Sequence, residues 1–521
     1  MEERTTMQVF NDPLYGPIEM HPLLVTIIDT PEFQRLRNIK QLGGGYFVFP
    51  GAYHNCFEHS ISVAHLAGQL VKSLKAHHGL NIITEQEELC VQIAGLCRDL
   101  GHGPFSHAFE EFMKKVKPKW KHEEQSVKMF KDLIGKHNIK EKMVNEGLEE
   151  KHLKLIEALI NPSNKDIQQD EPYLQQIVAN PRTGIDVDKM DCLIRDCHYL
   201  GMKYNFSPER YMKFARVCTN EKGEKQICML DKEASNIYEL FHIHNLLHHK
   251  AYQHRDKKAA ELMIVDALKA AEETFQISAQ VEDLQEYMTL TDDILQRIIH
   301  HQDNMDSTDS NPEDILKRIF QPGIQGVIGR FLQNNQPKED TTDSKLKTAE
   351  KAQKIIRRIF KRDFYKFVGG KILEPENVRQ LENAESQREM LREWLDQIME
   401  YKPLPLNADD FEVVLIKFNY GMKRKNPNDV LRFYKEDNPD QPIQLPEDEV
   451  SYLLPQKLEE TKGMLFYKGD DVFVEELAKE YIEVFWTNMM EDSKAKWLSE
   501  IFPFARNQHE LKDFMVKNSF L

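Results

Sequence analysis

The chain has 521 residues and a formal net charge of −16 at pH 7. This length supports a large buried core and more than one folding unit. The acidic balance argues against general nucleic-acid binding, which needs concentrated Lys and Arg, but it leaves room for a local basic pocket that binds nucleotides. No run of roughly 18 apolar residues occurs, so we expect no membrane-spanning helix.

The N-terminal segment MEERTTMQVFNDP lacks the apolar core of a secretory signal. The seven cysteines form no CxxC pair, and several lie within apolar helical runs. This usage is typical of a reducing compartment, so we expect a nuclear or cytoplasmic protein. Cys218 and Cys228 flank a predicted turn at Gly223 and could form a redox pair, but two free thiols are the simpler interpretation.

The first half of the chain is predicted to be helical. Thr30 suits a helix N-cap, and Pro31 suits the first helical position that follows it. Apolar residues then recur at helical spacing over 58–74 and 85–100. Helices predicted over 185–201 and 236–254 each align three side chains on one face. These are Asp188, Cys192 and Asp196 in the first helix, and His244, His248 and Tyr252 in the second.

Beyond about Phe275 the chain changes character. The segments 302–314 and 334–345 are polar and acidic, so they are predicted to be loops or links. FEVVLIKFNYG and GMLFYKG alternate apolar and polar residues, which predicts strands. The predicted fold is therefore mainly α, with a helical core over 1–275 and a smaller α+β C-terminal lobe over 276–521.

Acids and histidines cluster in three segments of the helical core. HNCFEHS contains His59, CRDLGHGPFSH contains Asp99, and GIDVDKMD contains Asp186 and Asp188. Imidazole and carboxylate groups together suit Fe, Mn, Zn or Mg. A metal held by His59, Asp99 and Asp188 would polarise a phosphoryl oxygen and acidify a bound water.

Three more histidines accompany this cluster, namely His102, His107 and His122. A histidine titrates near neutral pH, so each could transfer a proton or bind a phosphate oxygen. Taken singly, each is equally well explained as a packed core residue.

Four motifs together resemble the HD-domain phosphohydrolases, namely HNCFEHS, CRDLGHGPFSH, KHEEQSV and GIDVDKMD. Within that superfamily, the order and spacing of IKQLGGGYFVFPGA, AYQH and YGMKRKNP resemble the vertebrate deoxynucleoside triphosphate triphosphohydrolases. The resemblance covers nearly the whole chain, and we expect no SAM domain before the HD region. It implies a helical HD domain in a homotetramer assembled by nucleotides. It also implies cleavage of a dNTP into deoxynucleoside and triphosphate by attack of water at the α-phosphorus.

The resemblance assigns roles to individual residues. The family's metal ligands correspond to His59, Asp99 and Asp188. Its catalytic residues correspond to the acid His122 and to the phosphate-contacting His102 and His107. The rest of its substrate pocket corresponds to Leu42, Lys189, Asp196, His248 and Tyr252. Leu42 would pack against the sugar and so exclude a 2′-hydroxyl.

The resemblance also implies that GTP and a dNTP, bound with Mg²⁺, are allosteric activators. The guanine pocket would use Asp29, Gln34, Arg37, Arg362 and Lys366. The dNTP pocket would use Val9, Asn11, Val48, Arg210, Lys232, Asn236, His254 and Arg255, with Gln8 and Leu230 in place of two expected basic residues. Without the resemblance, Asp29 reads as part of a helix cap, and Arg362 and Lys366 as the solvated face of a basic amphipathic helix.

Four positions depart from the family pattern within the predicted active site. Arg98 replaces the first histidine of the HD pair, Cys56 and His244 replace arginines, and Cys192 replaces a tyrosine. An arginine cannot ligate a cation and brings a permanent positive charge. We therefore expect hydrolysis to be impaired or lost.

Several interpretations remain open at this point. A metal could persist on three ligands plus water, with Arg98 reaching the triphosphate, which would leave some hydrolysis. Alternatively, the chain is an inactive regulatory protein that senses GTP and dNTPs. Weak binding of single-stranded nucleic acid in a basic channel at an assembly interface is a third interpretation, which the net charge disfavours.

Overall fold

The computed structural model describes residues 7–163, 172–301, 339–381, 383–401, 407–419, 426–450 and 457–487. Within these ranges the chain is mainly helical, as predicted. The loop predicted at 302–314 lies outside the described residues. The chain's contacts divide it into two compact units. The first comprises residues 1–252, 260–363 and 425–455, and the second comprises residues 253–259, 364–424 and 456–521.

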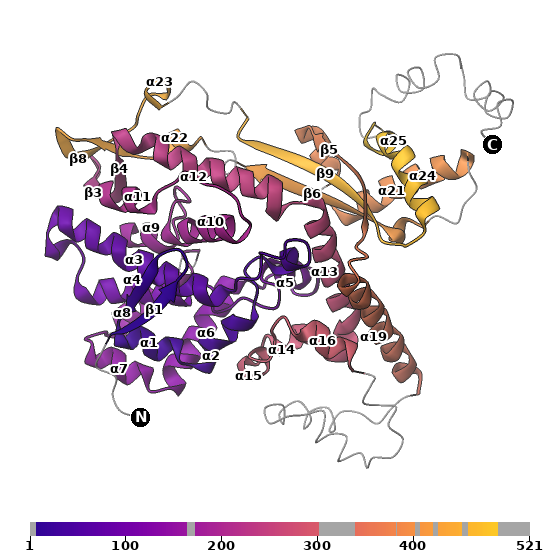
Figure 1. Ribbon diagram of the computed structural model, residues 1–521, viewed down its shortest axis with the longest axis horizontal. Helices are drawn as coiled ribbons and strands as arrows, with labels where there is room; N and C mark the ends of the chain where they lie inside the picture. Colours follow the sequence, from indigo (N-terminus) through magenta and orange to yellow (C-terminus); the bar gives the residue numbers. More distant parts are fainter. Residues whose placement is uncertain are drawn as a thin grey trace, which may run out of the picture. The chain divides into compact units, whose positions relative to one another are not determined.

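The core of the first unit is a group of helices around α3 (Cys56–His78) and α4 (Glu85–Cys97). These two helices pack against each other, α8 (Glu150–Ile160) packs on α4, and α10 (Val187–Tyr199) packs on α3 (Figure 1). A Cβ at Gly95 would lie 3.2 Å from an α3 side chain, so glycine permits the close approach of α4. The predicted site segments therefore belong to helices that share one core.

Local signals in the sequence determine where these helices begin. Thr30 caps α2 (Pro31–Gln34) through its side chain, as predicted. Capping boxes, in which side chain and backbone cap each other reciprocally, begin α3 and α4. The capping pairs are Asn55 with Glu58 and Thr84 with Glu87. The N-cap of α3, Asn55, thus lies four residues before His59 on the chain.

Further helices of the first unit surround this core. They include α1 (Pro22–Ile28), α5 (His107–Val116), α6 (His122–Lys136), α7 (Ile139–Asn145), α9 (Gln175–Val178), α11 (Pro208–Phe214), α12 (Ala234–Leu247), α14 (Ile277–Gln280), α15 (Leu284–Tyr287), α16 (Ile294–Ile299), α19 (Glu339–Phe360), α22 (Pro427–Val430) and α23 (Glu447–Val450). The residues of α13 (Arg255–Phe275) are divided between the two units.

The first unit also contains two small sheets. β1 (Gln8–Asp12) and β2 (Gly16–Met20) form an antiparallel hairpin. A four-stranded sheet has the order β3-β4-β7-β8, comprising β3 (Ala215–Thr219), β4 (Lys225–Leu230), β7 (Phe433–Lys435) and β8 (Asn438–Ile443). The turn predicted at Gly223 joins β3 and β4, and Gly223 has a φ of +79°, which favours glycine. All seven cysteines are free, in agreement with the simpler interpretation of Cys218 and Cys228.

Two sequence predictions fail at the ends of α19. The helix begins at Glu339, so part of the loop predicted at 334–345 is helical. The helix ends at Phe360, and Arg362 adopts a left-handed conformation with a φ of +59°. Lys366 begins a strand. Arg362 and Lys366 therefore do not lie on one face of an amphipathic helix.

The second unit contains a three-stranded antiparallel sheet with the order β5-β9-β6. The strands are β5 (Lys366–Leu373), β6 (Phe411–Asn419) and β9 (Glu459–Tyr467), and the last two overlap the predicted strands. Its helices include α20 (Pro375–Gln380), α21 (Ala384–Tyr401), α24 (Val472–Glu480) and α25 (Ile482–Thr487). Trp394 of α21 and Trp486 of α25 are buried in the core of this unit.

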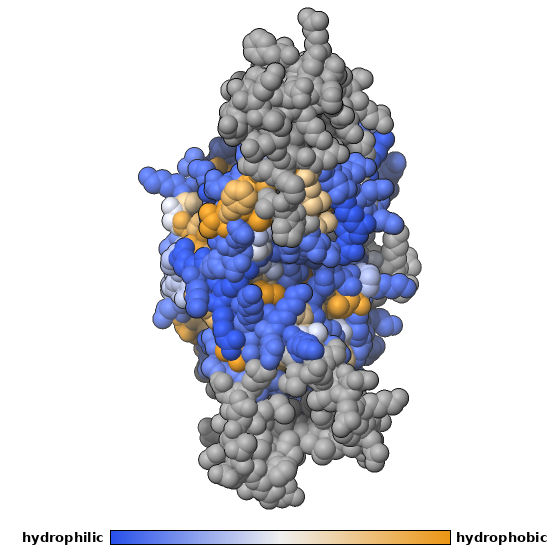
Figure 2. Space-filling model, turned by 90° about the vertical axis from the view of Figure 1, so that its right-hand side faces the viewer, coloured by the Kyte–Doolittle hydropathy of each residue, from blue (hydrophilic) through white to orange (hydrophobic). Residues whose placement is uncertain are grey.

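The surface seen in Figure 2 is mainly hydrophilic, with small apolar areas separated by charged and polar groups. In the described part of the chain, no helix combines the length and the apolar character needed to cross a bilayer.

Candidate active site

Three residues predicted as metal ligands lie together in the first unit. His59 is in the first turns of α3, Asp99 follows the end of α4, and Asp188 is in the first turn of α10. His59 Nε2 lies 3.0 Å from Asp188 Oδ1 and 3.4 Å from Asp99 Oδ2. One ligand atom from each residue fits within a span of 4.8 Å. An imidazole nitrogen and two carboxylates in this arrangement fit a divalent metal ion such as Fe, Mn or Zn.

A buried ion-pair network orients His59 through its Nδ1 atom, the ring nitrogen on the side away from Asp99 and Asp188. His59 Nδ1 donates to Asp191 Oδ2 at 2.7 Å, and Asp191 also accepts from Arg195 Nε at 2.9 Å. Arg195 in turn donates to Asp12 Oδ2 at 2.9 Å and to Ser62 Oγ at 2.7 Å. Burial would raise the pKa of Asp191, but the charge of Arg195 and the hydrogen bond from His59 lower it to about 2. A carboxylate that holds the far nitrogen of a ligating histidine is a common feature of metal sites.

Sequence analysis did not identify this supporting network. Asp191 and Arg195 are spaced i, i+4 on α10, and such a spacing of opposite charges could have indicated an ion pair. The contact with Asp12 joins residues 183 positions apart, and no local pattern indicates it. Asp186, which belonged to the predicted acidic cluster, is the N-cap of α10 and accepts from the backbone N–H of Lys189 at 2.9 Å. Asp186 therefore has a capping role.

Arg98 forms an ion pair with Asp188, one of the three predicted metal ligands. Its Nε donates to Asp188 Oδ2 at 3.0 Å, and its Nη1 donates to the Ile160 carbonyl at 2.9 Å. The Arg98 side chain is 17% exposed and that of Asp188 is 24% exposed. Burial would raise the pKa of Asp188, but the positive charge of Arg98 lowers it. Arg98 is therefore charged, and its guanidinium is hydrogen-bonded to Asp188 and to the Ile160 carbonyl.

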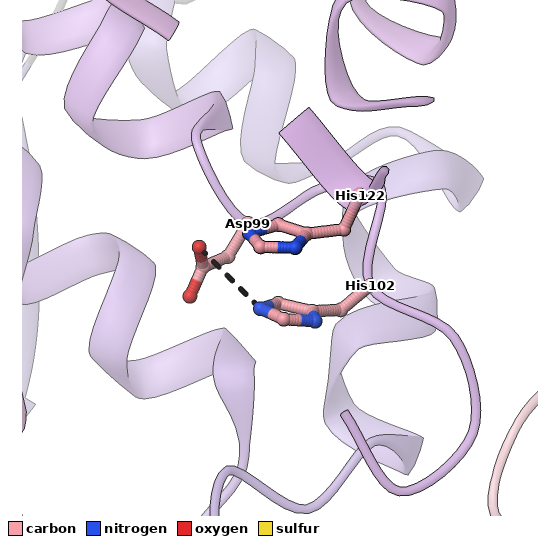
Figure 3. Close-up of side chains that lie close together, drawn as sticks. All are labelled: Asp99, His102 and His122. Carbon is pink, nitrogen blue, oxygen red and sulfur yellow. Dashed lines mark ion pairs between the residues drawn. The ribbon is translucent and has the colours of Figure 1, made fainter. Parts of the chain in front are cut away.

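The second half of the site is a set of imidazoles around Glu110. The rings of His102 and His122 stack at 4.1 Å with an interplanar angle of 13°, and Asp99 lies beside them (Figure 3). His122 Nδ1 lies 3.0 Å from one oxygen of Glu110, and His107 Nδ1 lies 3.3 Å from the other. His102 Nε2 is 3.7 Å from Asp99 Oδ1. Asp99 thus belongs to both halves of the site.

The pKa values of the two stacked histidines are shifted in opposite directions. Burial and the neighbouring charge of His122 lower the pKa of His102 to about 3. Burial would also lower the pKa of His122, but its hydrogen bond to Glu110 raises it above the ordinary value. The pKa values of the two imidazoles therefore lie apart, with His122 keeping its proton to higher pH than His102, which suits proton transfer. His107 is 74% exposed, so it is open to solvent and to an anionic ligand.

The loop between α4 and α5 is tightly constrained. A Cβ at Gly101 would lie 2.3 Å from the Ser126 backbone nitrogen, so only glycine fits there. Phe105 and Ser106 both have positive φ values, of 59° and 50°. Such values are uncommon outside glycine and persist where surrounding contacts hold them.

The last residue of α15 and the segment between α15 and α16 hold this loop. Asp292 Oδ1 accepts from the Phe105 N–H at 2.6 Å, and its Oδ2 accepts from the Lys40 N–H at 2.9 Å. Tyr287 donates to the Gly101 carbonyl at 2.7 Å. Burial raises the pKa of Asp292 to about 7, although both backbone donors act to lower it. Sequence analysis missed this support, because Asp292 lies 187 positions from Phe105.

The predicted substrate pocket is brought together in part. Asp196 accepts from the Tyr252 hydroxyl, and its Oδ1 lies 2.6 Å from His54 Nε2. The rings of His248 and Tyr252 lie 5.1 Å apart, and those of His244 and His248 lie 4.3 Å apart. Cys192 Sγ is 3.6 Å from Asp196 Oδ2. These residues of α10, of α12 and of the π-helical segment η6 (His248–Tyr252) that follows α12 lie together. Helical spacing predicted the alignment within each segment, and the family resemblance predicted that the segments share a pocket.

The segments that contain Leu42 and Cys56 lie next to the loop between α4 and α5. Leu42 precedes the short helix η2 (Gly43–Phe47), and a Cβ at Gly43 would lie 2.4 Å from the Phe105 carbonyl oxygen. Cys56 Sγ lies 3.6 Å from Ser106 Oγ. Burial raises the pKa of the Cys56 thiol, so it is neutral and brings no positive charge. Lys189 lies in the first turn of α10, next to Asp188.

Three residues predicted to read guanine lie together at the ends of α1 and α2. Asp29 is the C-cap of α1. Gln34 Nε2 donates to the Ile28 carbonyl at 2.8 Å, and Arg37 Nε donates to Gln34 Oε1 at 2.7 Å. The Arg37 guanidinium also stacks on the Phe57 ring at 3.6 Å. Asp29 therefore ends α1, the side chain of Thr30 caps α2, and the role of Asp29 in guanine binding stays a prediction.

The other predicted regulatory residues occupy several places in the two units. Those of the first unit are Gln8, Val9 and Asn11 on β1, Val48 after η2, Arg210, Lys232 and Asn236 around α11 and α12, and Arg362 after α19. Those of the second unit are His254, Arg255 and Lys366. Leu230 is buried with Cys218, Cys228 and Tyr434, so apolar packing explains why a basic residue is absent at this position.

Comparisons with known proteins find relatives over most of the chain. Residues 56–196 match the HD domain family. The chain is 40% identical over 505 residues to deoxynucleoside triphosphate triphosphohydrolase SAMHD1 of Danio rerio, covering 91% of this chain and 73% of the relative. It is 39% identical over 496 residues to the protein of the same name from Homo sapiens, covering 89% and 71%. A SAMHD1 homolog of Dictyostelium discoideum is 34% identical over 470 residues, covering 90% and 79%.

Proposed function

The chain belongs to the SAMHD1 family of deoxynucleoside triphosphate triphosphohydrolases, and we propose that its HD-domain site binds a dNTP and hydrolyses it to deoxynucleoside and triphosphate at a rate that Arg98 lowers. One observation carries this proposal. Asp99 is shared by the His59–Asp99–Asp188 cluster and the His102–His122 stack, so a cation site and a proton-transfer site adjoin.

The residues of the site have separate tasks in this reaction. A divalent cation bound by His59, Asp99 and Asp188 would polarise a phosphoryl oxygen and acidify a water molecule. Glu110 holds His122 at Nδ1, which leaves Nε2 to give its proton to the 5′-oxygen of the departing deoxynucleoside. His102 and His107 would contact phosphate oxygens, and the exposed His107 is the more accessible of the two.

The side chains of α10, α12 and η6 would receive the nucleoside. Asp196 is already bound by Tyr252 and His54, so its carboxylate is fixed before substrate arrives. Leu42 would lie against the sugar and disfavour a 2′-hydroxyl, because a buried apolar side chain offers that group no hydrogen bond. Lys189 would add positive charge for the triphosphate.

Three departures would lower the hydrolytic rate. Arg98 removes one metal ligand and occupies Asp188. The buried, neutral Cys56 cannot replace the charge of an arginine. Cys192 presents a thiol to Asp196 in place of an aromatic ring, which reduces stacking area for a base or sugar.

Nucleotide sensing is the second candidate function, and the Arg98–Asp188 ion pair favours it. In this alternative, GTP and dNTPs bind the regulatory residues and assemble a homotetramer without rapid turnover. The arrangement of Asp29, Gln34 and Arg37 supports guanine binding, because carboxylate, amide and guanidinium groups match the hydrogen-bonding edge of the base. We place the protein in the nucleus or cytoplasm.

The test is dGTP turnover by the purified chain with GTP and Mn²⁺ or Mg²⁺, with products separated by chromatography. The proposal expects slow release of deoxyguanosine and triphosphate, abolished in D99N. Release of dGMP and pyrophosphate would contradict the proposed reaction. GTP-dependent tetramers in sedimentation without any product would favour the sensor instead.

A further inference from the structure

Arg98 does more than remove a metal ligand, because it forms an ion pair with Asp188, one of the predicted ligands. Its Nε donates to Asp188 Oδ2 at 3.0 Å, on the carboxylate whose other oxygen lies 3.0 Å from His59 Nε2. Both oxygens of Asp188 are therefore engaged. A neutral residue at this position would have left Oδ2 open to a cation.

The guanidinium is also anchored on its other side. Arg98 Nη1 donates to the carbonyl of Ile160, the last residue of α8. Burial would lower the pKa of Arg98, but the charges of Asp188 and Asp99 raise it, so the guanidinium acts on both carboxylates of the cluster. Two hydrogen bonds to fixed partners thus hold a permanent positive charge at the place where the cluster would bind its cation.

Like charges repel strongly at a site of such low exposure. Asp188 is 24% exposed and Arg98 is 17% exposed, so water screens their surroundings poorly. A divalent cation on Asp188 would gain one carboxylate but would lie close to the guanidinium. Either the cation binds weakly, or Arg98 must leave Asp188 first.

We propose that Arg98 is an internal competitor of the metal, so that the guanidinium and a divalent cation bind Asp188 alternately. The inference rests on the proposed function only in taking His59, Asp99 and Asp188 as the cation site. It differs from the loss of a ligand in its cause. A lost ligand weakens metal binding because one donor atom is missing. Arg98 weakens it because its positive charge competes with the cation for Asp188.

Removing the charge without adding a ligand separates the two causes. In R98M an unbranched side chain takes the place of arginine with neither charge nor a strong donor for Mn²⁺, so competition disappears while the ligand count stays the same. R98K is the matched control, because it keeps the positive charge. R98H restores the ligand that the family pattern places here. R98Q serves as a second neutral variant if R98M does not fold, as judged by circular dichroism.

The experiment is titration of the chelator-treated, full-length chain and each variant with Mn²⁺ alone, without nucleotide. Free Mn²⁺ is measured by electron paramagnetic resonance, and the melting temperature is recorded in parallel. We expect R98M or R98Q to bind Mn²⁺ at least about tenfold more tightly than the wild type, R98K to resemble the wild type, and R98H to bind most tightly.

Equal Mn²⁺ affinities for the wild type and both neutral variants would overturn the inference, as would a wild-type affinity equal to that of R98H. The outcome is separate from the proposed reaction. Tighter Mn²⁺ binding by R98M and R98H without deoxyguanosine release would support the competition and contradict the hydrolytic function. Hydrolysis by R98H without tighter binding by either neutral variant would do the opposite.

Discussion

The two halves of the candidate active site differ in how they use charge. Around Glu110, two imidazoles share one carboxylate, and the pKa values of the stacked His102 and His122 are shifted in opposite directions. Around Asp188, a permanent cation from the protein occupies the carboxylate. The first half retains groups that can transfer a proton, whereas the second half contains a guanidinium that stays protonated at any working pH. The single residue Arg98 therefore changes the surroundings of Asp188, while His102, His107, His122 and Glu110 stay assembled next to it.

The largest effect should come from the proton donor in a chain whose cation site has been restored. In an R98H background, H122Q removes the imidazole that would protonate the leaving group, and we expect dGTP hydrolysis to fall by about 10²–10⁴-fold. Initial rates by chromatography measure this loss. H137Q, at the C-terminal end of the same helix, is the control, and a comparable loss in both variants would deny His122 its special role.

The network behind His59 should contribute most to stability. D191N leaves the fully buried Arg195 with one carboxylate fewer and weakens the support of His59, which we expect to cost about 3–5 kcal/mol of unfolding free energy. Urea denaturation measures this quantity. The matched control is E111Q, which removes a surface pair with Lys114 and should change stability by less than about 1 kcal/mol. Similar costs for both variants would contradict the role of the network.

The support of the loop by Asp292 predicts a specific dependence of stability on pH. The pKa of Asp292 is raised from 3.8 to about 7, so between these values the folded state holds a proton that the unfolded state has lost. The free energy of unfolding should therefore fall as pH rises through this window. D292N should cost about 1 kcal/mol at pH 5 and flatten this part of the curve. Parallel curves for the wild type and D292N would show that the pKa of Asp292 is not raised.

The smallest effect should be a shift in the pH profile of hydrolysis. Glu110 raises the pKa of His122, and a proton donor is lost as pH rises above its pKa. E110Q in the R98H background should therefore move the alkaline limb of the rate profile toward lower pH. The rate profile of kcat, measured with dGTP, shows this directly. An unmoved limb would mean that another group controls the alkaline side.

The sequence was sufficient to predict the residues whose signals are local. His59, Asp99 and Asp188 lie at helix ends, where capping residues and apolar spacing identify the helices, and the structure brings them together. Helical spacing also predicted the alignment of Asp196 within one helix and of Tyr252 within another, whereas the family resemblance predicted that the two share a pocket, and in the structure they are hydrogen-bonded. The strands β6 and β9 were also recognisable, because they alternate apolar and polar residues.

The supporting contacts could not be predicted in this way, because they join distant parts of the chain. Asp12 and Arg195 meet across 183 positions, and Asp292 and Phe105 across 187, with no local pattern at either end. The structure also shows what the sequence left open at Arg98. Its guanidinium is directed to Asp188 and Ile160, which disfavours the interpretation that it reaches toward a triphosphate.

The most direct test of the account is the ratio of dGTP hydrolysis rates of R98H and the wild type, measured with GTP and saturating Mn²⁺. The account predicts that deoxyguanosine and triphosphate form at least about 100-fold faster in R98H, since both a ligand and the freedom of Asp188 are restored. Equal rates in the two proteins, whether both fast or both absent, would contradict the central claim that Arg98 limits this site.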